Sequence, residues 1–438
     1  MKGARGGRAW ACAGLCALLL GACEDAASSM TGEHDAGGDA GDVRVAPEVD
    51  AFELIEQDGL PVVHLWVADD VDALEHRPAR LVYRGREHEG VQAKYRGQTS
   101  LAYPKKSFTV KLSADDPFDE PEHGMTSRRR VVLTTTFDDN SYLRQRLAYA
   151  LWNRLQPRIE VRAFNAVLYL NGRYHGLYLV SDHVDDDLMA AHGLWAGGNL
   201  YKARNHDANL RLVDRWGEPK TALETGYTKE EGEPEQGQPG AFDDLHALIT
   251  WADTAPDDEL VAQLDEVLDR ADFTAWLVLV SAIDAMDSAG KNGYLYHDPR
   301  PAAPDPRWHY VPWDFNASFG QDWQTWRLSS RGALSFYDRQ NALFQRFTGV
   351  GALQEASAQR YRAALAGALS ASEVLALFDA YADEIAEAAQ RDERTWSAPM
   401  RAYDWGGREQ PFTDFDQERA YVRQWIAERW ALIAERYR

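Results

Sequence analysis

Short apolar runs separated by turns dominate the chain from about residue 50 to residue 181. The runs read LPVVHLWVA (60–68), ARLVYRG (79–85), KSFTVKL (106–112), RRVVLTT (129–135) and FNAVLYLNGRYHGLYLV (164–180). Segments of this length, rich in branched and aromatic residues, are typical of β-strands. The Asn171-Gly172 pair inside the last run fits the tight turn of a β-hairpin. Apolar residues at helical spacing over residues 142–155 predict one helix among five or six strands.

Beyond residue 182 the apolar positions recur mainly every three or four residues, which is the spacing of amphipathic helices. The predicted helices span residues 241–251, 256–268, 271–285, 351–367, 371–389 and 416–437. A stretch rich in Gly, Glu and Pro over residues 226–240 predicts an exposed loop. The whole pattern predicts an α+β protein, with a strand-rich part over about residues 50–181 and a mainly helical part over about residues 182–438.

The N-terminal segment has a different character from the rest of the chain. Three basic residues precede an apolar run over residues 10–20 and the sequence LGAC, which ends at Cys23. This is the layout of a secretory signal, and the run is too short to span a bilayer. LGAC also resembles the bacterial lipobox, which implies a signal peptide over residues 1–22 and lipid on Cys23 as the membrane anchor. An ordinary signal peptide with an incidental cysteine is the alternative.

Residues 23–48 are small and acidic, so we expect a flexible tether before a domain over residues 49–438. Glu24 resembles the sorting pattern of lipoproteins sent to an outer membrane, so we expect a lipid-anchored protein of the cell envelope. All three cysteines lie within the first 23 residues, which excludes disulfides and cysteine-ligated zinc in the domain. The net charge of -22 argues against nucleic acid as a partner, and it leaves the lipid as the expected link to a membrane.

The candidate chemistry is concentrated in AIDAMDSAGKNGYLYHDPRPAAPDPRWHYVPWDFNASFG (282–320). Asp287 and Asn292 stand five residues apart, and Asp314 follows within VPWDF. This is the order of a kinase catalytic carboxylate and the Asn and Asp that bind Mg²⁺. Asp287 could instead close a loop after the predicted helix, and Asn292 could satisfy buried backbone groups.

Several segments in one order resemble the CotH kinase family of atypical protein kinases. They are YRGQTSLAYPKKSFTVKL (95–112), SYLRQRLAYALWNRL (141–155), NGRYHGLYLVSDHVDDDLM (171–189), NLYKA (199–203), KNGYLYHDP (291–299) and VPWDFNASFG (311–320). The resemblance covers about residues 50–320. It implies a protein-kinase-like fold, with a strand-rich small lobe, a helical large lobe and a nucleotide cleft between them.

The resemblance also implies roles for individual residues. Asp287 would be the catalytic carboxylate, Asn292 and Asp314 would bind Mg²⁺ or Mn²⁺, and ATP would be the phosphoryl donor. Lys106 would face the phosphates, with Lys105 and Lys111 as rivals for that position and Lys202 as a second contact. The phosphate-covering turn would contain Arg96, Gln98, Thr99 and Ser100. Lys105 and Lys106 could also be a solvated strand edge.

The implied reaction is transfer of the γ-phosphoryl group of ATP to Ser or Thr hydroxyls of an exported protein. Two departures from the family pattern favour an alternative, a non-catalytic surface or coat protein that binds a protein or polysaccharide. Asn316 replaces the second acidic residue of the PWDLD motif, and the helix over residues 142–155 contains no acidic residue. The acidic residues of the SDHVDDD segment predict a charged turn that leads into a helix, and the tryptophans from Trp308 to Trp326 are expected mainly in the core.

Overall fold

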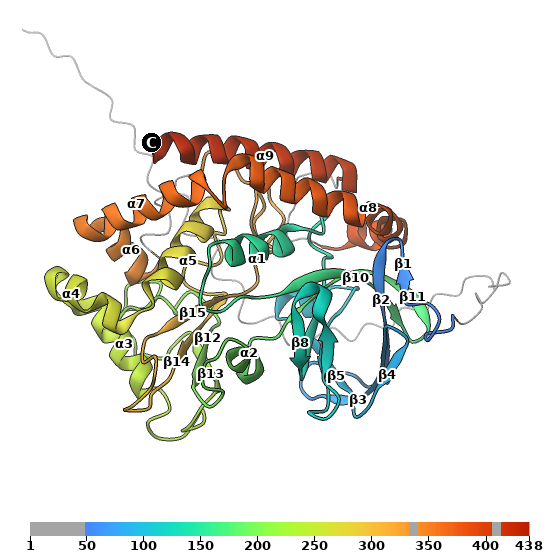
Figure 1. The fold of residues 1–438 in the computed structure, drawn as a ribbon, viewed down its shortest axis with the longest axis horizontal. Helices are drawn as coiled ribbons and strands as arrows, with labels where there is room; N and C mark the ends of the chain where they lie inside the picture. The colour runs from blue at the N-terminus through green and yellow to red at the C-terminus, as the bar shows by residue number, and fades with distance from the viewer. Residues whose placement is uncertain (1–48, 333–339, 405–412, 438) are drawn as a thin grey trace, which may run out of the picture. The chain divides into compact units, whose positions relative to one another are not determined.

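The computed structural model describes residues 49–332, 340–404 and 413–437. The signal peptide, the tether and the lipidated cysteine expected from the sequence lie outside these residues. The mixed α and β class expected from the sequence is confirmed (Figure 1).

A nine-stranded sheet forms most of the first part of the described chain. Its strands are β1 (Glu56–Gln57), β2 (Leu60–Val67), β3 (Arg77–Tyr83), β4 (Arg86–His88), β5 (Gln92–Arg96), β6 (Ser107–Lys111), β9 (Arg130–Thr135), β10 (Ala163–Leu170) and β11 (Arg173–Asp182). The order is β1-β2-β10-β11-β9-β6-β5-β3-β4, and β3 also pairs with β2, so the sheet curls back on itself. Neighbouring strands are antiparallel except for β2 and β10. Each predicted run forms a strand, whereas short β1, β4 and β5 were not expected.

The predicted hairpin joins β10 to β11. Asn171 and Gly172 both adopt positive φ, at 50° and 77°, which suits a tight turn between twisted strands. The pairing of the two strands begins next to the turn, with Leu170 opposite Arg173, and ends with Ala163 opposite Ser181. The local sequence therefore determines both the turn and the pairing of these strands.

The two faces of this sheet belong to two different cores, because strand side chains alternate in direction. On β10, Phe164, Ala166 and Leu168 pack inside the curled sheet. Val167 and Tyr169 point to the other side and join the main core of the protein. Helix α1 (Arg144–Arg154) packs on this second face against β10.

A second, four-stranded antiparallel sheet follows in the chain, with the order β13-β12-β14-β15. Its strands are β12 (Asn199–Ala203), β13 (Tyr227–Glu231), β14 (Gly293–His297) and β15 (His309–Pro312). β13 lies within residues 226–240, so the prediction of a loop there was wrong for its first part. A two-stranded ribbon, β7 (Phe118–Glu120) with β8 (Met125–Arg128), and the 3₁₀ turns η1 (Thr99–Ala102) and η2 (Pro121–His123) complete the smaller elements.

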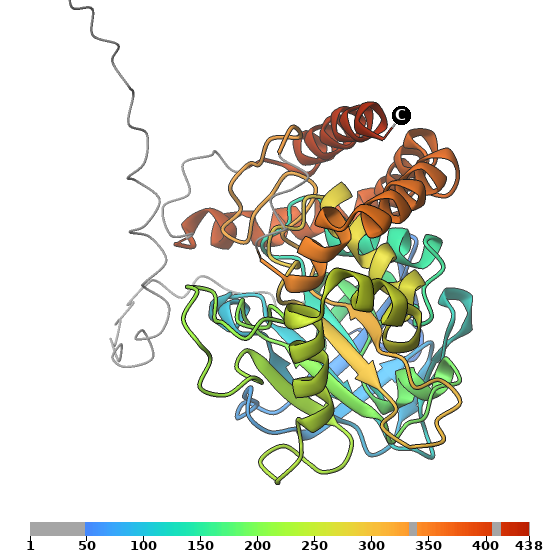
Figure 2. The ribbon, with the colours of Figure 1, turned by 90° about the vertical axis from the view of Figure 1, so that its left-hand side faces the viewer.

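The remaining helices lie mainly after the second sheet begins (Figures 1 and 2). They are α2 (Asp186–Ala191), α3 (Asp243–Thr254), α4 (Asp257–Val267), α5 (Arg270–Ala282), α6 (Ala342–Gly349), α7 (Gly351–Ala366), α8 (Ala371–Ala402) and α9 (Phe415–Arg436). All six predicted helices are present, but α8 continues well beyond residue 389 and α6 was not predicted.

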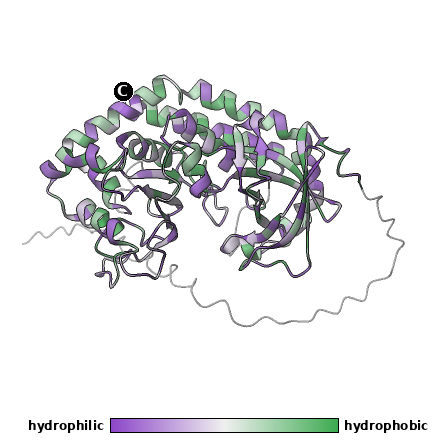
Figure 3. Ribbon diagram, turned by 60° about the horizontal axis from the view of Figure 1, so that its bottom comes forward, coloured by the Kyte–Doolittle hydropathy of each residue, from purple (hydrophilic) through white to green (hydrophobic). Residues whose placement is uncertain are grey.

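Helices α8 and α9 pack against each other, and α8 also contacts β2 and β11 of the large sheet. Hydrophilic and hydrophobic residues alternate along these helices, as expected for elements with one buried face (Figure 3). Among the described residues, no single helix is long and apolar enough to cross a membrane, and only α7 and α8 taken together, bent by 57°, meet the length and composition of a span.

Candidate active site

One cavity of about 170 Å³ is lined by residues at or next to the ends of strands from both sheets. Its lining includes most residues that the sequence predicted for a site: Arg96, Gln98, Thr99, Ser100, Asp287, Asn292 and Asp314. Arg96 ends β5 opposite Ser107, which begins β6. In the second sheet, Ala203, Gly293 and Pro312 lie side by side at one edge. The strand ends of two sheets therefore bring together residues that are far apart in the chain.

The turn after β5 covers one side of this cavity. Gly97 has a φ of 121°, and a Cβ atom at this position would collide with the side chain of Ser100. Only glycine fits both the backbone conformation and the space. The turn then enters η1, so Gln98, Thr99 and Ser100 line the cavity without a GxGxxG motif.

Asp287 lies after the end of α5, and its carboxylate is held by three polar neighbours. Lys291 Nζ lies 2.9 Å from Oδ2, and His206 Nε2 lies 3.4 Å from Oδ1. Asn292 donates a hydrogen bond of 3.3 Å to Oδ2. Burial opposes ionisation, but His206 and Lys291 outweigh it and lower the pKa of Asp287. The carboxylate is therefore ionised at neutral pH, as a proton acceptor or metal ligand must be.

Asn292 and Asp314 share an unusual backbone conformation. Their φ angles are 56° and 60°, in the left-handed region that Asn and Asp tolerate better than other side chains. Burial raises the pKa of Asp314, the charge of Arg96 lowers it, and the charge of Asp287 raises it. A divalent cation near the carboxylates of Asp287 and Asp314 would relieve the repulsion between them. Carboxylate and amide oxygens are the ligands that Mg²⁺ and Mn²⁺ prefer, so the donor set fits such an ion.

Three cationic side chains gather around the same cavity. Arg96 and Arg204 line it, and Lys202 lies close enough for the charges of Arg96 and Asp314 to act on its pKa. Burial and Arg96 lower the pKa of Lys202. Arg96 and Lys202 lie over the rings of Trp313 and Tyr294, at 4.8 and 5.6 Å. Within the described ranges, none of the three cations forms an ion pair, although the chain is strongly acidic.

None of the three lysines proposed to face phosphate from the PKKS segment lines this cavity. Lys106 donates a hydrogen bond of 2.5 Å to the carbonyl of Leu101, and burial lowers its pKa. Lys111 is exposed at the far end of β6 from Ser107, which puts it roughly 13 Å along the strand from the cavity edge. These positions remove Lys106 and Lys111 from direct contact with a ligand in the cavity as it stands.

Lys105 has a different position from the one expected, because it is fully buried on the opposite side of the segment. Its Nζ lies 2.6 Å from Oδ1 of Asp392 in α8, and it also donates to the carbonyl of Leu177 at 2.9 Å. The same carboxylate oxygen accepts the backbone N–H of Leu177 at 2.7 Å. Lys105 is therefore a structural link between the large sheet and α8.

The turn between β9 and α1 contributes two acidic residues that sequence analysis missed. Asp138 and Asp139 line the cavity, and Asn316 donates a hydrogen bond to Oδ2 of Asp138. Burial, together with the charges of Asp139 and Asp314, raises the pKa of Asp138 to about 6, against the effect of Asn316. The adjacent pair in FDDNS was the only sign in the sequence.

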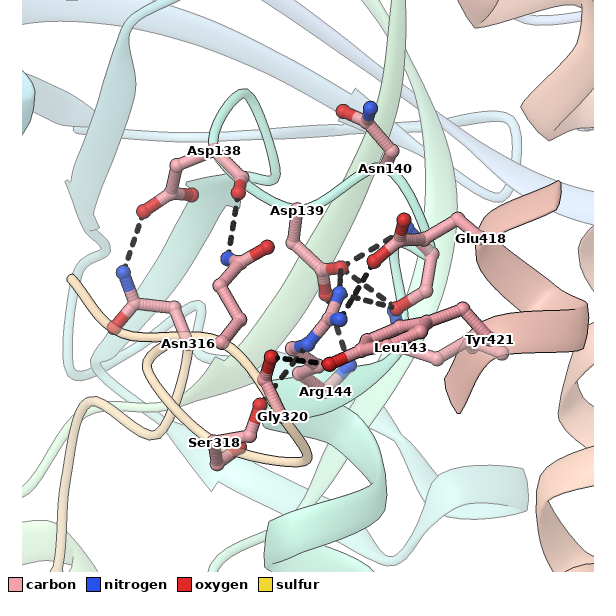
Figure 4. A network of polar contacts seen from close by, with 12 residues as sticks. Asp138, Asp139, Asn140, Leu143, Arg144, Asn316, Ser318, Gly320, Glu418 and Tyr421 are labelled. Atoms are coloured by element: carbon pink, nitrogen blue, oxygen red, sulfur yellow. Dashed lines mark hydrogen bonds and ion pairs between the residues drawn. The ribbon is translucent and has the colours of Figure 1, made fainter. Parts of the chain in front are cut away.

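A buried ionic network lies directly behind this turn (Figure 4). Arg144 forms ion pairs with Asp139 and with Glu418 of α9. Arg327 also pairs with Glu418, and Arg144 Nε donates to the carbonyl of Ser318 at 3.0 Å. Burial would raise the pKa of Glu418, but the two arginines lower it to about 2. The network joins α1, α9 and the segment after Asp314 around the floor of the site.

Two other groups of acidic residues could hold a metal ion, and neither lines this cavity. They are Asp185, Asp186 and Asp187, and Asp269, Asp305 and His309. In the first group, Asp185 caps α2 and its neighbours pair with Arg129, which confirms the predicted charged turn before a helix. In the second, Arg307 bridges Asp269 and Asp305.

The tryptophans after Trp308 divide into two kinds. Trp308 and Trp313 are buried, as expected for the core. Trp323 and Trp326 are 44% and 38% exposed, and Trp323 lines the cavity. For these two residues the expectation of a core position was wrong.

Comparison with known proteins places most of the chain in one family. A family model described as CotH kinase protein matches residues 93–433, which contain every residue assigned to the cavity. The chain belongs to the CotH kinase protein family. Inner spore coat protein H of Bacillus subtilis (strain 168) is 27% identical over 231 residues, which are 52% of this chain. The match covers 58% of the length of that relative.

Membership of the CotH family implies a kinase-like fold and agrees with the segments quoted from the sequence. The family match also extends through α9, well beyond residue 320, where the resemblance read from the sequence ended. Arg204 and Lys291, which line the cavity, and His206, which contacts Asp287, had no role assigned from the sequence. Lys291 stands inside the quoted KNGYLYHDP segment and Arg204 directly follows NLYKA, so their positions in those motifs could have identified them.

Proposed function

We propose that this protein transfers the γ-phosphoryl group of ATP to Ser or Thr hydroxyls of an exported protein, with Mg²⁺ or Mn²⁺ as cofactor. The observation that supports this best is the meeting of Asp287, Asn292 and Asp314 in one cavity with Arg96 and Arg204, which form no ion pair within the part of the chain that the structure describes. A phosphoryl-transfer site needs oxygen ligands for the cation, positive charge for the phosphates and a carboxylate for the acceptor hydroxyl. All three kinds of group are present here.

In this proposal each residue has a distinct task. Asp287 accepts or orients the proton of the attacking hydroxyl, and Lys291 keeps its carboxylate ionised. Asn292 and Asp314 hold the divalent cation, which would neutralise charge on the phosphates when bound. Arg96 and Lys202 bind the phosphate oxygens, taking the place expected for the lysines of the PKKS segment. The cavity volume of about 170 Å³ suits the triphosphate end of a nucleotide, and the partly exposed Trp323 in its lining could contact the remainder.

The alternative, a non-catalytic surface or coat protein, has one structural observation in its favour. Helix α1 presents Gln145 to the cavity, and the helix contains no acidic side chain that could pair with a phosphate-binding lysine. A kinase normally requires such a pair to be in place for activity. In this alternative the cavity binds a ligand without turning it over.

The expected location of the protein also belongs to this proposal. The relative is an inner spore coat protein, which supports an exported or coat-associated protein. We further propose lipid on Cys23 and attachment to the outer membrane. Mass spectrometry of the purified protein would detect the diacylglycerol adduct on a chain that begins at residue 23. A mature chain that retains residues 1–22, or lacks lipid, would refute the anchor.

Transfer of labelled γ-phosphate tests the activity. The protein is incubated with ATP, Mg²⁺ or Mn²⁺ and casein as a generic acceptor, beside Asp287→Asn and Asp314→Asn. We expect each substitution to lower the rate by roughly 100-fold or more, because each removes a charged group that acts in the transition state. Asp379→Asn is the matched control, because Asp379 lies in α8 and forms a partly exposed pair with Arg423.

The possible outcomes separate the two functions. Label incorporated by the parent and the control, and lost in both site variants, supports phosphoryl transfer. Nucleotide binding by calorimetry without any incorporation supports the binding protein. If neither transfer nor nucleotide binding is detected with either metal, both the enzymatic proposal and its ligand are wrong.

A further inference from the structure

Asp138 lines the cavity, and the proposed function gives it no task. It lies in the turn between β9 and α1, and only 8% of its surface is exposed. Its Oδ2 accepts hydrogen bonds from Asn316 at 2.5 Å and from the hydroxyl of Tyr103 at 3.4 Å. Its backbone carbonyl accepts a hydrogen bond of 2.8 Å from Gln321. These contacts hold Asp138 in place through its Oδ2 and its backbone. No described residue donates a hydrogen bond to its Oδ1.

Asp138 and its neighbour Asp139 have opposite electrostatic environments. The carboxylate of Asp139 is neutralised by the buried guanidinium of Arg144 and also accepts hydrogen bonds from Ser141. Among the residues that the structure describes, no cationic side chain lies within ion-pair distance of Asp138. A buried carboxylate without a counter-charge is costly unless a ligand supplies the positive charge.

A second observation comes from the threonines that precede this turn. Thr135 and Thr136 are 4% and 6% exposed and line the same cavity. Their hydroxyl oxygens are buried and have no hydrogen-bond partner among the described residues. Buried hydroxyls are nearly always satisfied, so these oxygens indicate that a polar ligand belongs in this part of the cavity. Thr136 stands two residues before Asp138 and faces the same space.

Asp138 and Asp314 line the same cavity, and the charge of Asp314 is one of the causes that raise the pKa of Asp138. At position 316 the chain has an amide where the PWDLD motif has a carboxylate, and that amide binds Asp138 directly. The Asp138 carboxylate therefore lies beside the position where the motif has its second acidic residue, and the side chain of Asn316 orients that carboxylate.

We propose that Asp138 and Asp314 together bind a second divalent cation in this cavity, with Asn316 holding the Asp138 carboxylate in place. The inference rests on the proposed function, which brings a first cation and a triphosphate to the same space. A second cation held by these residues would supply further positive charge to stabilise the phosphates during transfer. The oxygen ligands of Asp138, Asp314 and the unpartnered threonine hydroxyls suit Mg²⁺ and Mn²⁺.

The test counts Mn²⁺ ions by electron paramagnetic resonance, in the presence of one equivalent of a non-hydrolysable ATP analogue. The variants are Asp138→Asn, which keeps the shape of the side chain, and the exchange variant Asp138→Asn with Asn316→Asp, which moves the carboxylate to position 316. Glu230→Gln is the charge-matched control, because Glu230 acts on Lys202 from an exposed position outside the cavity. Melting temperatures of all variants verify that they are folded.

We expect two Mn²⁺ ions per parent chain with the spectral broadening of a close pair, one ion without broadening in Asp138→Asn, and two ions again in the exchange variant. The control should bind two. If the parent and Asp138→Asn both bind one ion, the inference is overturned while nucleotide binding and transfer still stand. If Asp138→Asn retains the close pair, the inference is likewise wrong. Absence of both nucleotide and Mn²⁺ binding refutes it together with the proposed function.

Discussion

The buried ion pair between Lys105 and Asp392 gives the sharpest prediction about stability. Both side chains are fully buried, and together they satisfy the backbone N–H and carbonyl of Leu177. Lys105→Met leaves a buried carboxylate without its cation, and Asp392→Asn leaves a buried ammonium without its anion. Breaking such a pair from one side typically costs about 3–5 kcal/mol of unfolding free energy.

The double variant should lose less than either single variant. Met and Asn carry no charge, and the Asn oxygen can still accept the N–H of Leu177. What remains unsatisfied is the Leu177 carbonyl, at a cost of about 1–3 kcal/mol. Removing the second charge from a single variant should therefore recover roughly 2 kcal/mol, the difference between these two costs.

Urea unfolding followed by tryptophan fluorescence and circular dichroism measures these free energies. Trp396 reports locally, because its ring lies 5.8 Å from Lys105 Nζ. Asp379→Asn in the same helix removes a partly exposed pair and should cost less than about 1 kcal/mol. Additive losses in the double variant, or single variants as stable as this control, would show that the two charges do not compensate each other.

Three further changes have defined outcomes. Lys202→Met should weaken binding of ATP by about tenfold or more in calorimetry, since it removes one charge-assisted phosphate contact. Lys106→Met should leave the affinity unchanged. Equal effects of the two substitutions would contradict the proposal that Lys202, and not Lys106, contacts phosphate. Glu418 has a folded pKa of about 2, below its ordinary value of 4.5, so its stabilising contribution is complete above pH 4.5 and is lost as the pH falls toward 2. Glu418→Gln should therefore unfold more easily at pH 7 by about 3 kcal/mol but lose little more in acid, and a steep acid loss in this variant would refute the linkage. Gly176→Ala should destabilise the fold far more than Gly59→Ala, because both glycines have positive φ but only at Gly176 would a Cβ atom strike the buried ion pair; similar losses of stability would leave backbone strain as the whole effect.

Local sequence patterns were sufficient for many elements of this fold. Alternating apolar runs identified the longer strands, and Asn171-Gly172 identified the hairpin, because these features depend on residues close in the chain. The spacing of Asp287, Asn292 and Asp314 also predicted side chains that the structure brings into one cavity. Gly293 pairs with Pro312 at the ends of β14 and β15, which brings Asn292 and Asp314 close together, and Asn292 donates to Asp287 five residues earlier.

Features that depend on distant contacts were missed. The polar residues after residue 389 ended the predicted helix, but Met400 packs with Tyr103 and Phe137 and extends α8 to Ala402. Lys105 was interpreted as a phosphate contact or a solvated strand edge, because its partner Asp392 lies 287 residues away. Asp138 gained significance only from its contact with Asn316, 178 residues later. No periodicity in the sequence encodes such pairs.

The ionic network behind the site also has a consequence for how the chain matures. Arg144 needs Glu418, which is 274 residues further along, and Arg327 needs the same carboxylate. During synthesis the large sheet and α1 emerge before α9, so Arg144 can pair with Asp139 early, but Glu418 joins the network only after α9 has been made. The network behind the cavity is therefore completed only after α9 has left the ribosome, so a chain interrupted before α9 would lack the Glu418 carboxylate that joins both arginines.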